Sequence, residues 1–331
     1  MTGSTMTRRD WLGAIGAAAA VASRTRAAFA AQTQKPLQGV FKILATPYKQ
    51  DKSVDYEDLA AEVEFLVRCG VQGLVWPQNS SDLPYLVEEE ILEGMEVIAK
   101  AARGTKPALV LGVQGRNTET MLRFAAHAER LDPDAMIAMP PKEAATLDEY
   151  REYFGELCRL TSRPVFIQTS AGAPDIEPAV DFIVEMGKKF PNFGYVKEEY
   201  GETIPRMIEL AKHRPGPIKR IFGGSRALGW TYEMRLGMDG MMTGGPQYAE
   251  VYARIWQLHL ENRLDAVRDL YSKLLLITNL ESHVPGLRPY LMKQRGVFKT
   301  HVTRRGDFEL GPAAIAEIEY NLEPLKPYLN A

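Results

Sequence analysis

The chain has 331 residues, of which 45% are hydrophobic and 25% are charged. This composition is typical of a globular protein and excludes a disordered, collagen-like or disulfide-scaffold chain. The formal net charge is -2 and the 40 Lys and Arg residues are spread along the sequence, so nothing indicates a nucleic-acid-binding surface and small-molecule partners are expected.

The N-terminus has the composition of a targeting segment. Arg8 and Arg9 precede a weakly apolar stretch at residues 13–22, and Ala28-Phe29-Ala30 offers a small-residue cleavage site. This order resembles a twin-arginine export signal over residues 1–30 and implies a periplasmic protein. The apolar stretch has about half of the roughly 20 residues needed to cross a bilayer, so we expect no stable membrane anchor after processing.

From residue 40 onward, short apolar runs alternate with longer amphipathic stretches. The apolar runs predict strands at residues 40–46, 73–76, 108–113, 135–139, 165–169, 194–197, 219–222 and 240–243. Apolar positions at three- and four-residue spacing predict helices at residues 56–69, 88–102, 118–131, 147–160, 177–190 and 204–213. This α/β alternation over residues 31–245 predicts a closed (β/α)8 TIM barrel, since no G-x-G-x-x-G turn follows the first strand to indicate an open sheet.

Residues 246–331 follow a different pattern. Only helices are predicted there, at residues 248–261, 264–280 and 286–295. We interpret them as a C-terminal helical extension of the same domain, which either caps the barrel or forms an oligomer contact. Cys69 and Cys158 fall about three strand-helix units apart in the predicted barrel, beyond the roughly 7 Å reach of a disulfide, so two free thiols are expected.

The candidate active site follows from the barrel. Active sites of such barrels lie at the carboxyl ends of the strands, so the residues that end each apolar run are the candidates. These residues are Thr46, residues 78–82, Gln114, Lys142, residues 168–170, Lys197, residues 223–225 and Thr243. We expect Thr46, Gly223 and Thr243 to contact substrate. No metal site is predicted, because the five histidines show no paired ligand spacing.

Lys197 ends an apolar run and is expected to point into the mouth of the barrel. A lysine there forms a Schiff base with a 2-oxo acid, but only the neutral amine attacks the carbonyl. Lowering the pKa of a lysine from about 10.4 to about 7 costs roughly 4 to 5 kcal/mol, which burial or a neighbouring cation must supply, and Lys142 is the candidate cation. The alternative is that Lys197-Glu198-Glu199 is a charged strand exit exposed to water.

Four motifs, each weak alone, occur in a recognisable order. They are Ala45-Thr46-Pro47-Tyr48, Tyr195-Val196-Lys197-Glu198, Gly237-Met238-Asp239-Gly240-Met241-Met242 and residues 286–293. From Gly39 to about Gly296, the chain resembles the dihydrodipicolinate synthase and N-acetylneuraminate lyase family of class I Schiff-base aldolases and dehydratases. The resemblance implies that Lys197 forms the imine, that the substrate is pyruvate or a 2-oxo sugar acid, that no cofactor is needed beyond this covalent imine, and that the protein is a homo-oligomer.

The sequence departs from the family at the turn that binds the substrate carboxylate. Residues 78–82 replace the family's G-T-T-G-E turn. The side chains expected to contact substrate there are Asn79, Ser80, Ser81 and Asp82. Hydroxyls and backbone N-H groups of such a turn still offer a carboxylate site.

The sequence also departs from the family at the proton relay. The two relay tyrosines fall at Gln168 and near Lys142, and the arginine that grips the second substrate of true dihydrodipicolinate synthases falls near Ala173. A glutamine orients water or a substrate hydroxyl but is no general acid or base. Lys142, Glu199 and the substrate's own carboxylate are therefore the candidates for proton transfer. Glu199 shares the strand face of Lys197 by two-residue alternation.

The sequence leaves two functions open. The first is an exported lyase that forms a Schiff base at Lys197 for aldol cleavage, condensation or dehydration. The second is a barrel that binds a small carboxylate without turnover, because both relay tyrosines are replaced. Glu199 fits either function: it serves as a base, or it keeps Lys197 as a cation and prevents imine formation.

Overall fold

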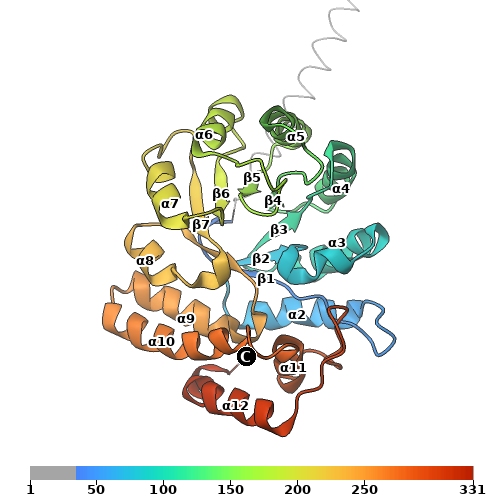
Figure 1. Cartoon of the computed structure of the whole chain (residues 1–331), viewed down its shortest axis with the longest axis vertical. Coiled ribbons are helices and arrows are strands. Elements are labelled where there is room, and N and C mark those ends of the chain that lie inside the picture. Colours follow the sequence, from blue (N-terminus) through green and yellow to red (C-terminus); the bar gives the residue numbers. More distant parts are fainter. Residues whose placement is uncertain (1–34, 331) are drawn as a thin grey trace, which may run out of the picture. The chain divides into compact units, whose positions relative to one another are not determined.

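The protein is a closed barrel of parallel strands. The computed structural model describes residues 35–330, so the export signal predicted over residues 1–30 lies outside the described residues. The chain divides into a unit of Met1–Lys35 and a unit of Pro36–Ala331, and the second unit contains the barrel. Its strands, in order around the barrel (Figure 1), are β1 (Gly39–Ile43), β2 (Gly73–Trp76), β3 (Ala108–Gly112), β4 (Ala135–Ala138), β5 (Val165–Gln168), β6 (Tyr195–Glu198), β7 (Arg220–Gly223) and β8 (Gly240–Thr243). The predicted TIM barrel is confirmed.

Helices surround the barrel. They are α2 (Tyr56–Arg68), α3 (Glu88–Ala102), α4 (Thr118–Arg130), α5 (Leu147–Leu160), α6 (Val180–Lys189), α7 (Thr203–Ala211) and α8 (Trp230–Arg235). Asp55 begins α2 by accepting hydrogen bonds from the Glu57 and Asp58 backbone N-H groups at 3.2 Å. Only α6 starts clearly later than predicted, because Pro178 disfavours helical backbone at the residue before it.

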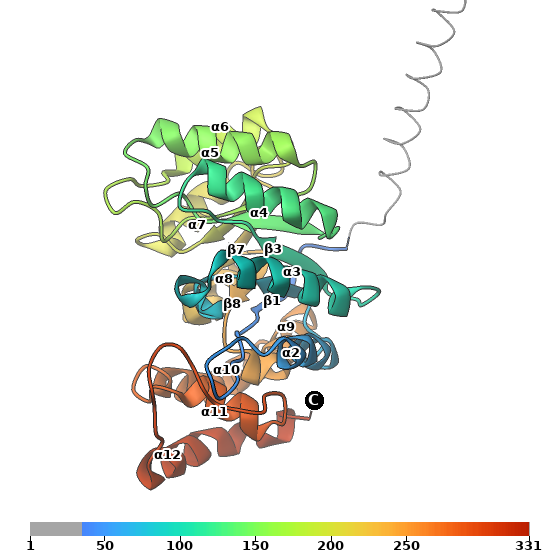
Figure 2. The same cartoon turned by 90° about the vertical axis from the view of Figure 1, so that its right-hand side faces the viewer.

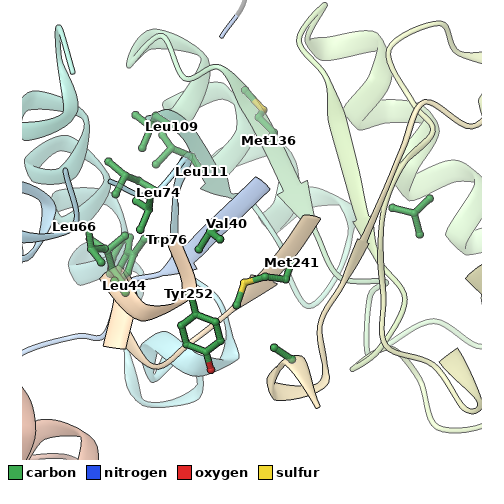
Figure 3. Packing of buried hydrophobic residues seen from close by; sticks show 14 of the residues in the cluster. Val40, Leu44, Leu66, Leu74, Trp76, Leu109, Leu111, Met136, Met241 and Tyr252 are labelled. Atoms are coloured by element: carbon green, nitrogen blue, oxygen red, sulfur yellow. The ribbon is translucent and has the colours of Figure 1, made fainter. Parts of the chain in front are cut away.

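Alternation along each strand separates two apolar layers. One set of side chains fills the barrel interior, namely Phe41, Ile43, Val75, Val110, Ile137, Phe166, Phe222 and Met242. The other set packs outward against the helices, as Val40, Leu74, Leu111 and Met241 do in Figure 3. Gln168 on β5 is paired in register with Lys197 on β6. Gln168 lies two residues after Phe166, and Lys197 lies two residues after Tyr195, and both aromatic residues belong to the inner layer. Both side chains therefore belong to the inner face, at the carboxyl end of the barrel.

The C-terminal extension is helical, as predicted. Its helices are α9 (Ala249–Leu260), α10 (Leu264–Leu280), α11 (Leu287–Gln294) and α12 (Pro312–Leu322). The sequence pattern did not predict α12. Helices α10, α11 and α12 lie on the same side of the barrel as α2 in both views (Figure 2). Cys69 and Cys158 are buried free thiols, in agreement with the expectation. Within residues 35–330, no helix is both long enough and apolar enough to cross a membrane.

Candidate active site

Lys197 is buried at the carboxyl end of β6. Its side chain is only 4% exposed. Its Nζ atom donates a hydrogen bond to Gln168 Oε1 at 2.9 Å and lies 3.2 Å from Glu199 Oε2. Both neighbours are acceptors, so the resting site stabilises an ammonium. The side-chain alternation that predicts Lys197 and Glu199 on one face is confirmed by this ion pair.

A chain of hydrogen bonds fixes Glu199. Gln168 Nε2 donates to Ser170 Oγ at 3.0 Å, and Ser170 Oγ donates to Glu199 Oε2 at 2.9 Å. The other carboxylate oxygen, Oε1, accepts the backbone N-H of Ser225 at 2.9 Å. Each Glu199 oxygen is thereby held, and Oε2 faces the lysine. A carboxylate in this position accepts a proton from the lysine without changing its rotamer.

Glu198 has a different environment from that of Glu199, although the two are adjacent. Alternation turns Glu198 to the outer face of β6, where it is fully buried. Its Oε1 accepts hydrogen bonds from Thr169 Oγ1 at 2.7 Å and from the Tyr200 backbone N-H at 2.9 Å, and it lies 3.1 Å from Arg206 Nε. Burial raises the pKa of Glu198 despite the nearby guanidinium. Its contacts fasten β6 to β5 and α7 and do not face the barrel mouth.

Lys142 lies away from this cluster of side chains. It is exposed in the turn that follows β4. Among the described residues, no hydrogen bond or ion pair joins it to Lys197. The structure therefore brings together Lys197, Gln168 and Glu199 but not the predicted neighbouring cation.

The loops after β1 and β2 are locked together. Thr46 Oγ1 donates to the Ser81 carbonyl oxygen at 2.5 Å and accepts from Trp76 Nε1 at 3.2 Å. Ser81 Oγ donates to the Leu44 carbonyl oxygen at 2.6 Å and is fully buried. Of the predicted substrate contacts in this region, the Ser81 hydroxyl is thus committed to the fold. For the Ser80 hydroxyl, no hydrogen-bond partner is found in the part of the chain that the structure describes.

Two glutamines lie beneath the same loop. Gln78 Nε2 donates to Gln114 Oε1 at 2.8 Å, and Gln114 Nε2 donates to the Pro77 carbonyl oxygen at 2.9 Å. Gln78 Oε1 is buried without a hydrogen-bond partner among residues 35–330. A buried amide oxygen of this kind is a free acceptor for a substrate hydroxyl or a water molecule.

Neither Gly223 nor Thr243 presents a side chain to a substrate at the barrel mouth. A Cβ atom at Gly223 would lie 1.9 Å from Glu233 Oε2, so only glycine fits and only its backbone can meet a ligand. Thr243 follows Met242, which points into the barrel, and alternation turns Thr243 to the outer face. The prediction selected the last residue of each apolar run without considering whether its side chain faces into or out of the barrel. For this reason it included Thr243.

A pocket of about 320 Å³ opens at the carboxyl end of the barrel and is called the C-terminal pocket below. Its floor contains the predicted residues Thr46, Ser80 and Asp82. The rest of its lining was not predicted from the sequence: Ala45, Arg226, Glu281, Val284, Pro285, Gly286, Leu287, Arg288, Pro289, Phe298, Val302, Thr303, Arg305 and Phe308. Asn79 borders it through its carbonyl oxygen, which accepts from Arg305 Nη2 at 2.9 Å. Most of the wall therefore comes from the C-terminal extension, which caps one side of the barrel mouth.

The C-terminal pocket adjoins the lysine site through the loop after β7. Ser225 in this loop bonds to Glu199, and the next residue, Arg226, lines the pocket. The strand-end prediction covered residues 223–225 and stopped one position before Arg226. Residues 297–308 carry no periodic pattern, so no local signal predicts that they lie at the site.

A second buried lysine lies behind the pocket. Lys42 on β1 is on the outer face of the barrel, fully buried, with Nζ 4.0 Å from the centre of the Tyr252 ring. Its Nζ also donates to the Gly244 carbonyl oxygen. Burial, reinforced by the positive charge of Arg288, holds the pKa of Lys42 well below its usual value, and the carboxylate of Glu281 opposes this shift only in part.

The fold and the site together define a parallel (β/α)8 barrel with a buried lysine at its carboxyl end, held between an amide and a carboxylate. The family model of the dihydrodipicolinate synthetase family matches residues 36–308. The chain belongs to this family and is a carbon-carbon or carbon-oxygen lyase of the class I aldolase and dehydratase type.

Individual relatives are distant. A 4-hydroxy-tetrahydrodipicolinate synthase of Parabacteroides distasonis is 26% identical over 238 residues, which cover 71% of this chain and 78% of that protein. An L-2-keto-3-deoxyarabonate dehydratase of Azospirillum brasilense is 23% identical over 299 residues, which cover 87% and 95% of the two chains. The structure of a chloride-inhibited dihydrodipicolinate synthase from Acinetobacter baumannii complexed with pyruvate matches with a TM-score of 0.76 and 17% identity, covering 87% of this chain and 98% of that chain. This structural likeness supports the fold.

Proposed function

We propose that the protein forms a Schiff base between Lys197 and pyruvate or another 2-oxo acid, and uses it for aldol cleavage, aldol condensation or dehydration. The observation that carries the proposal is the position of Lys197 Nζ, which is enclosed at the barrel mouth between Gln168 Oε1 and Glu199 Oε2. The family membership supports it, as do the names of relatives that include both a synthase and a dehydratase.

Imine formation begins with a proton transfer from Lys197 to Glu199. The neutral amine attacks C2 of the 2-oxo acid and gives a carbinolamine after the nitrogen proton moves to the former carbonyl oxygen. Glu199 then returns its proton to that hydroxyl, which leaves as water, and the product is the iminium. Gln168 keeps its amide oxygen toward the nitrogen throughout, because Ser170 holds its amide nitrogen.

The iminium then withdraws electrons from the neighbouring carbons. In a dehydration Glu199, again a carboxylate, takes the proton from C3 and returns it to the hydroxyl at C4, which leaves as water. In an aldol cleavage Glu199 takes the proton of the C4 hydroxyl, and the C3–C4 bond breaks. C4 becomes a carbonyl carbon, and the electron pair of the broken bond moves to the iminium and gives the enamine. We propose Thr46 and Ser80 as substrate contacts and Glu199 as the base that replaces the family's phenolic relay.

Borohydride trapping tests the proposal. Mature protein, incubated with pyruvate or with sugar-derived 2-oxo acids and then reduced, is weighed by intact mass spectrometry. The expected result is one reduced adduct on the wild type and on Lys142→Ala, a matched lysine variant, and none on Lys197→Ala. Absence of an adduct with every acid in the panel would remove the Schiff-base function.

A second function is favoured by one specific observation. Lys197 Nζ forms an ion pair with Glu199, and the lysine side chain is almost completely buried. A nitrogen held in an ion pair is a poor nucleophile. In this alternative the barrel binds a small carboxylate without turnover. Binding of a 2-oxo acid by calorimetry that survives Lys197→Ala, together with no adduct and no turnover in the wild type, would establish it.

We also propose that the protein is exported to the periplasm and assembles as a homo-oligomer. The support is the order of motifs in residues 1–30 and the family to which the chain belongs. Light scattering on the mature protein measures the subunit number, and a mass equal to one chain would contradict the assembly.

A further inference from the structure

The wall of the C-terminal pocket is largely apolar. The residues that form this apolar wall are Val284, Pro285, Leu287, Pro289, Phe298, Val302 and Phe308. A sugar acid carries a hydroxyl on nearly every carbon, and each hydroxyl placed against this wall would lose its hydrogen bonds to water without replacement. A hydrocarbon group instead gains by leaving water. The wall therefore favours an apolar substituent.

Phe308 is held in place as part of this wall. A Cβ atom at Gly286 would lie 2.9 Å from the Phe308 Cβ, and one at Gly306 would lie 2.9 Å from the Phe308 Cζ. Both glycines have positive φ, +84° and +155°, so a larger residue fits neither by space nor by backbone conformation. The chain thus keeps two special positions that seat one aromatic ring at the pocket.

Charge in the pocket is balanced except at one residue. Arg305 pairs with Asp82, and Arg288 pairs with Glu281 at 2.7 Å. Arg226 donates to the Ser282 hydroxyl, and no carboxylate lies within ion-pair distance of it among the described residues. The lining therefore has one uncompensated positive charge, which matches a ligand with one carboxylate.

The loop that presents Arg226 is strained and anchored. Ser225, Arg226 and Ala227 have φ values of +44°, +58° and +59°, a region that non-glycine residues rarely adopt and that is common at ligand-binding sites. The Tyr271 hydroxyl secures the loop through the carbonyl oxygens of Ala227 at 2.5 Å and Leu228 at 2.9 Å. The loop thus contacts the lysine site through Ser225, which bonds to Glu199, and the C-terminal pocket through Arg226.

We propose that the C-terminal pocket selects monocarboxylic 2-oxo acids that carry an aryl or long alkyl group, and that Arg226 binds their carboxylate while the apolar wall takes the hydrocarbon. This inference rests on the proposed Schiff-base function, for which it names the substrate class. The apolar wall disfavours polyhydroxylated 2-oxo acids, because their hydroxyl groups find no hydrogen-bond partners there. Dicarboxylic 2-oxo acids are disfavoured because Arg226 is the one uncompensated positive charge in the described lining and can neutralise only one carboxylate.

Binding of acids without a 2-oxo group tests the pocket separately from the imine chemistry. Calorimetry compares 4-phenylbutanoate, gluconate and glutarate on the mature protein. We expect 4-phenylbutanoate to bind at least about tenfold more tightly than the other two. Arg226→Gln and Phe308→Ala should each weaken it by about tenfold, whereas Arg226→Lys should restore part of the loss and the exposed-lysine variant Lys49→Ala should leave it unchanged.

Borohydride trapping then ranks 2-oxo-4-phenylbutanoate against pyruvate and a 2-keto-3-deoxy sugar acid. Higher trapping of the phenyl compound supports the proposal. Equal or tighter binding of gluconate or glutarate, or no loss in Arg226→Gln with an unchanged melting temperature, would overturn it. If 4-phenylbutanoate binds as expected while no 2-oxo acid is trapped, the pocket assignment stands and the Schiff-base function fails. If pyruvate is trapped and 4-phenylbutanoate does not bind, the Schiff-base function stands and the pocket assignment fails.

Discussion

At the scale of single residues, the protein shows how position decides the role of a carboxylate. Glu198 and Glu199 are neighbours in sequence, yet one fastens the outside of the barrel and the other faces the lysine at 3.2 Å. The two environments differ because successive side chains of a strand point to opposite faces of the sheet. This alternation also explains why Lys197 and Glu199 were predictable from the sequence and why Lys142, which lies in a turn without such alternation, was not.

Glu199→Gln tests the proposed proton transfer. The amide keeps the shape of the carboxylate but cannot accept the lysine proton, so turnover should fall by about 10² or more. Steady-state kinetics measures this, and the acidic limb of the pH–rate profile, which reports the ionised base, should disappear. Ser170→Ala is the milder control, since it removes one hydrogen bond to Glu199 and keeps the charge. Wild-type rates in Glu199→Gln would assign the proton transfer elsewhere.

Lys42→Met tests the buried amine behind the pocket. The folded-state pKa of Lys42 is depressed, so between that pKa and the ordinary value of about 10.4 the unfolded chain binds a proton that the folded chain does not. The free energy of unfolding should therefore rise with pH in this window by up to about 1.4 kcal/mol per unit. Urea denaturation at pH 7 and pH 9 should show this rise in wild type and a smaller one in Lys42→Met. The exposed-lysine variant Lys49→Met should retain the wild-type slope, and an equal slope in all three proteins would contradict the assignment.

At the scale of elements, residues 297–308 act as a strap over the loops that follow β1 and β2. Arg304 pairs with Glu90 at 2.6 Å and donates to the Lys52 carbonyl oxygen at 2.8 Å. Lys299 lies 3.0 Å from carboxylate oxygens of both Asp55 and Asp58 at the start of α2. Charged side chains thus fix this irregular segment, together with the buried side chains of Val297 and Phe298. This is the physical reason that hydrophobic periodicity gave no signal for it.

Arg304→Ala should destabilise the protein by about 1 to 3 kcal/mol, because the guanidinium and Glu90 are mostly buried and the carboxylate would be left without its partner. Lys326→Ala removes a well-exposed pair and should cost less than about 1 kcal/mol. Urea denaturation compares them. Hydrogen bonds from Arg304 lower the pKa of Glu90, so this stabilisation should be present above the ordinary glutamate pKa of about 4.3 and should be lost as the pH falls further. Equal costs for the two variants would contradict the role of the strap.

At the scale of the whole molecule, strand and helix order followed from the sequence while the complete site did not. The apolar runs predicted all the strands of the described barrel to within a few residues, since fully buried strands are short and strongly apolar. The C-terminal pocket joins strand ends near residues 45–82 to a wall near residues 281–308. No local pattern connects segments so far apart in sequence, so Arg226, Arg288 and Arg305 were found only in the folded structure.

The proposed export concerns the whole chain and needs its own test. Arg8→Lys combined with Arg9→Lys keeps both charges and removes the arginine pair that the export pathway reads. We expect the wild type to fractionate with the periplasm and the double variant to stay in the cytoplasm at the length of the unprocessed chain. Immunoblotting of cell fractions measures both, and export of the double variant would contradict a twin-arginine signal.

The distance in sequence between the floor and the wall of the C-terminal pocket has a consequence for biosynthesis. Residues 45–82 leave the ribosome first, whereas Phe298 and Phe308 emerge long after them. A nascent chain that already contains Lys197 still lacks the surface that recognises a ligand. Ligand binding can stabilise only a state that holds the whole site, so a cellular acid cannot favour or trap a partly synthesised chain. Sensitivity to ligand begins only after residue 308 has been synthesised.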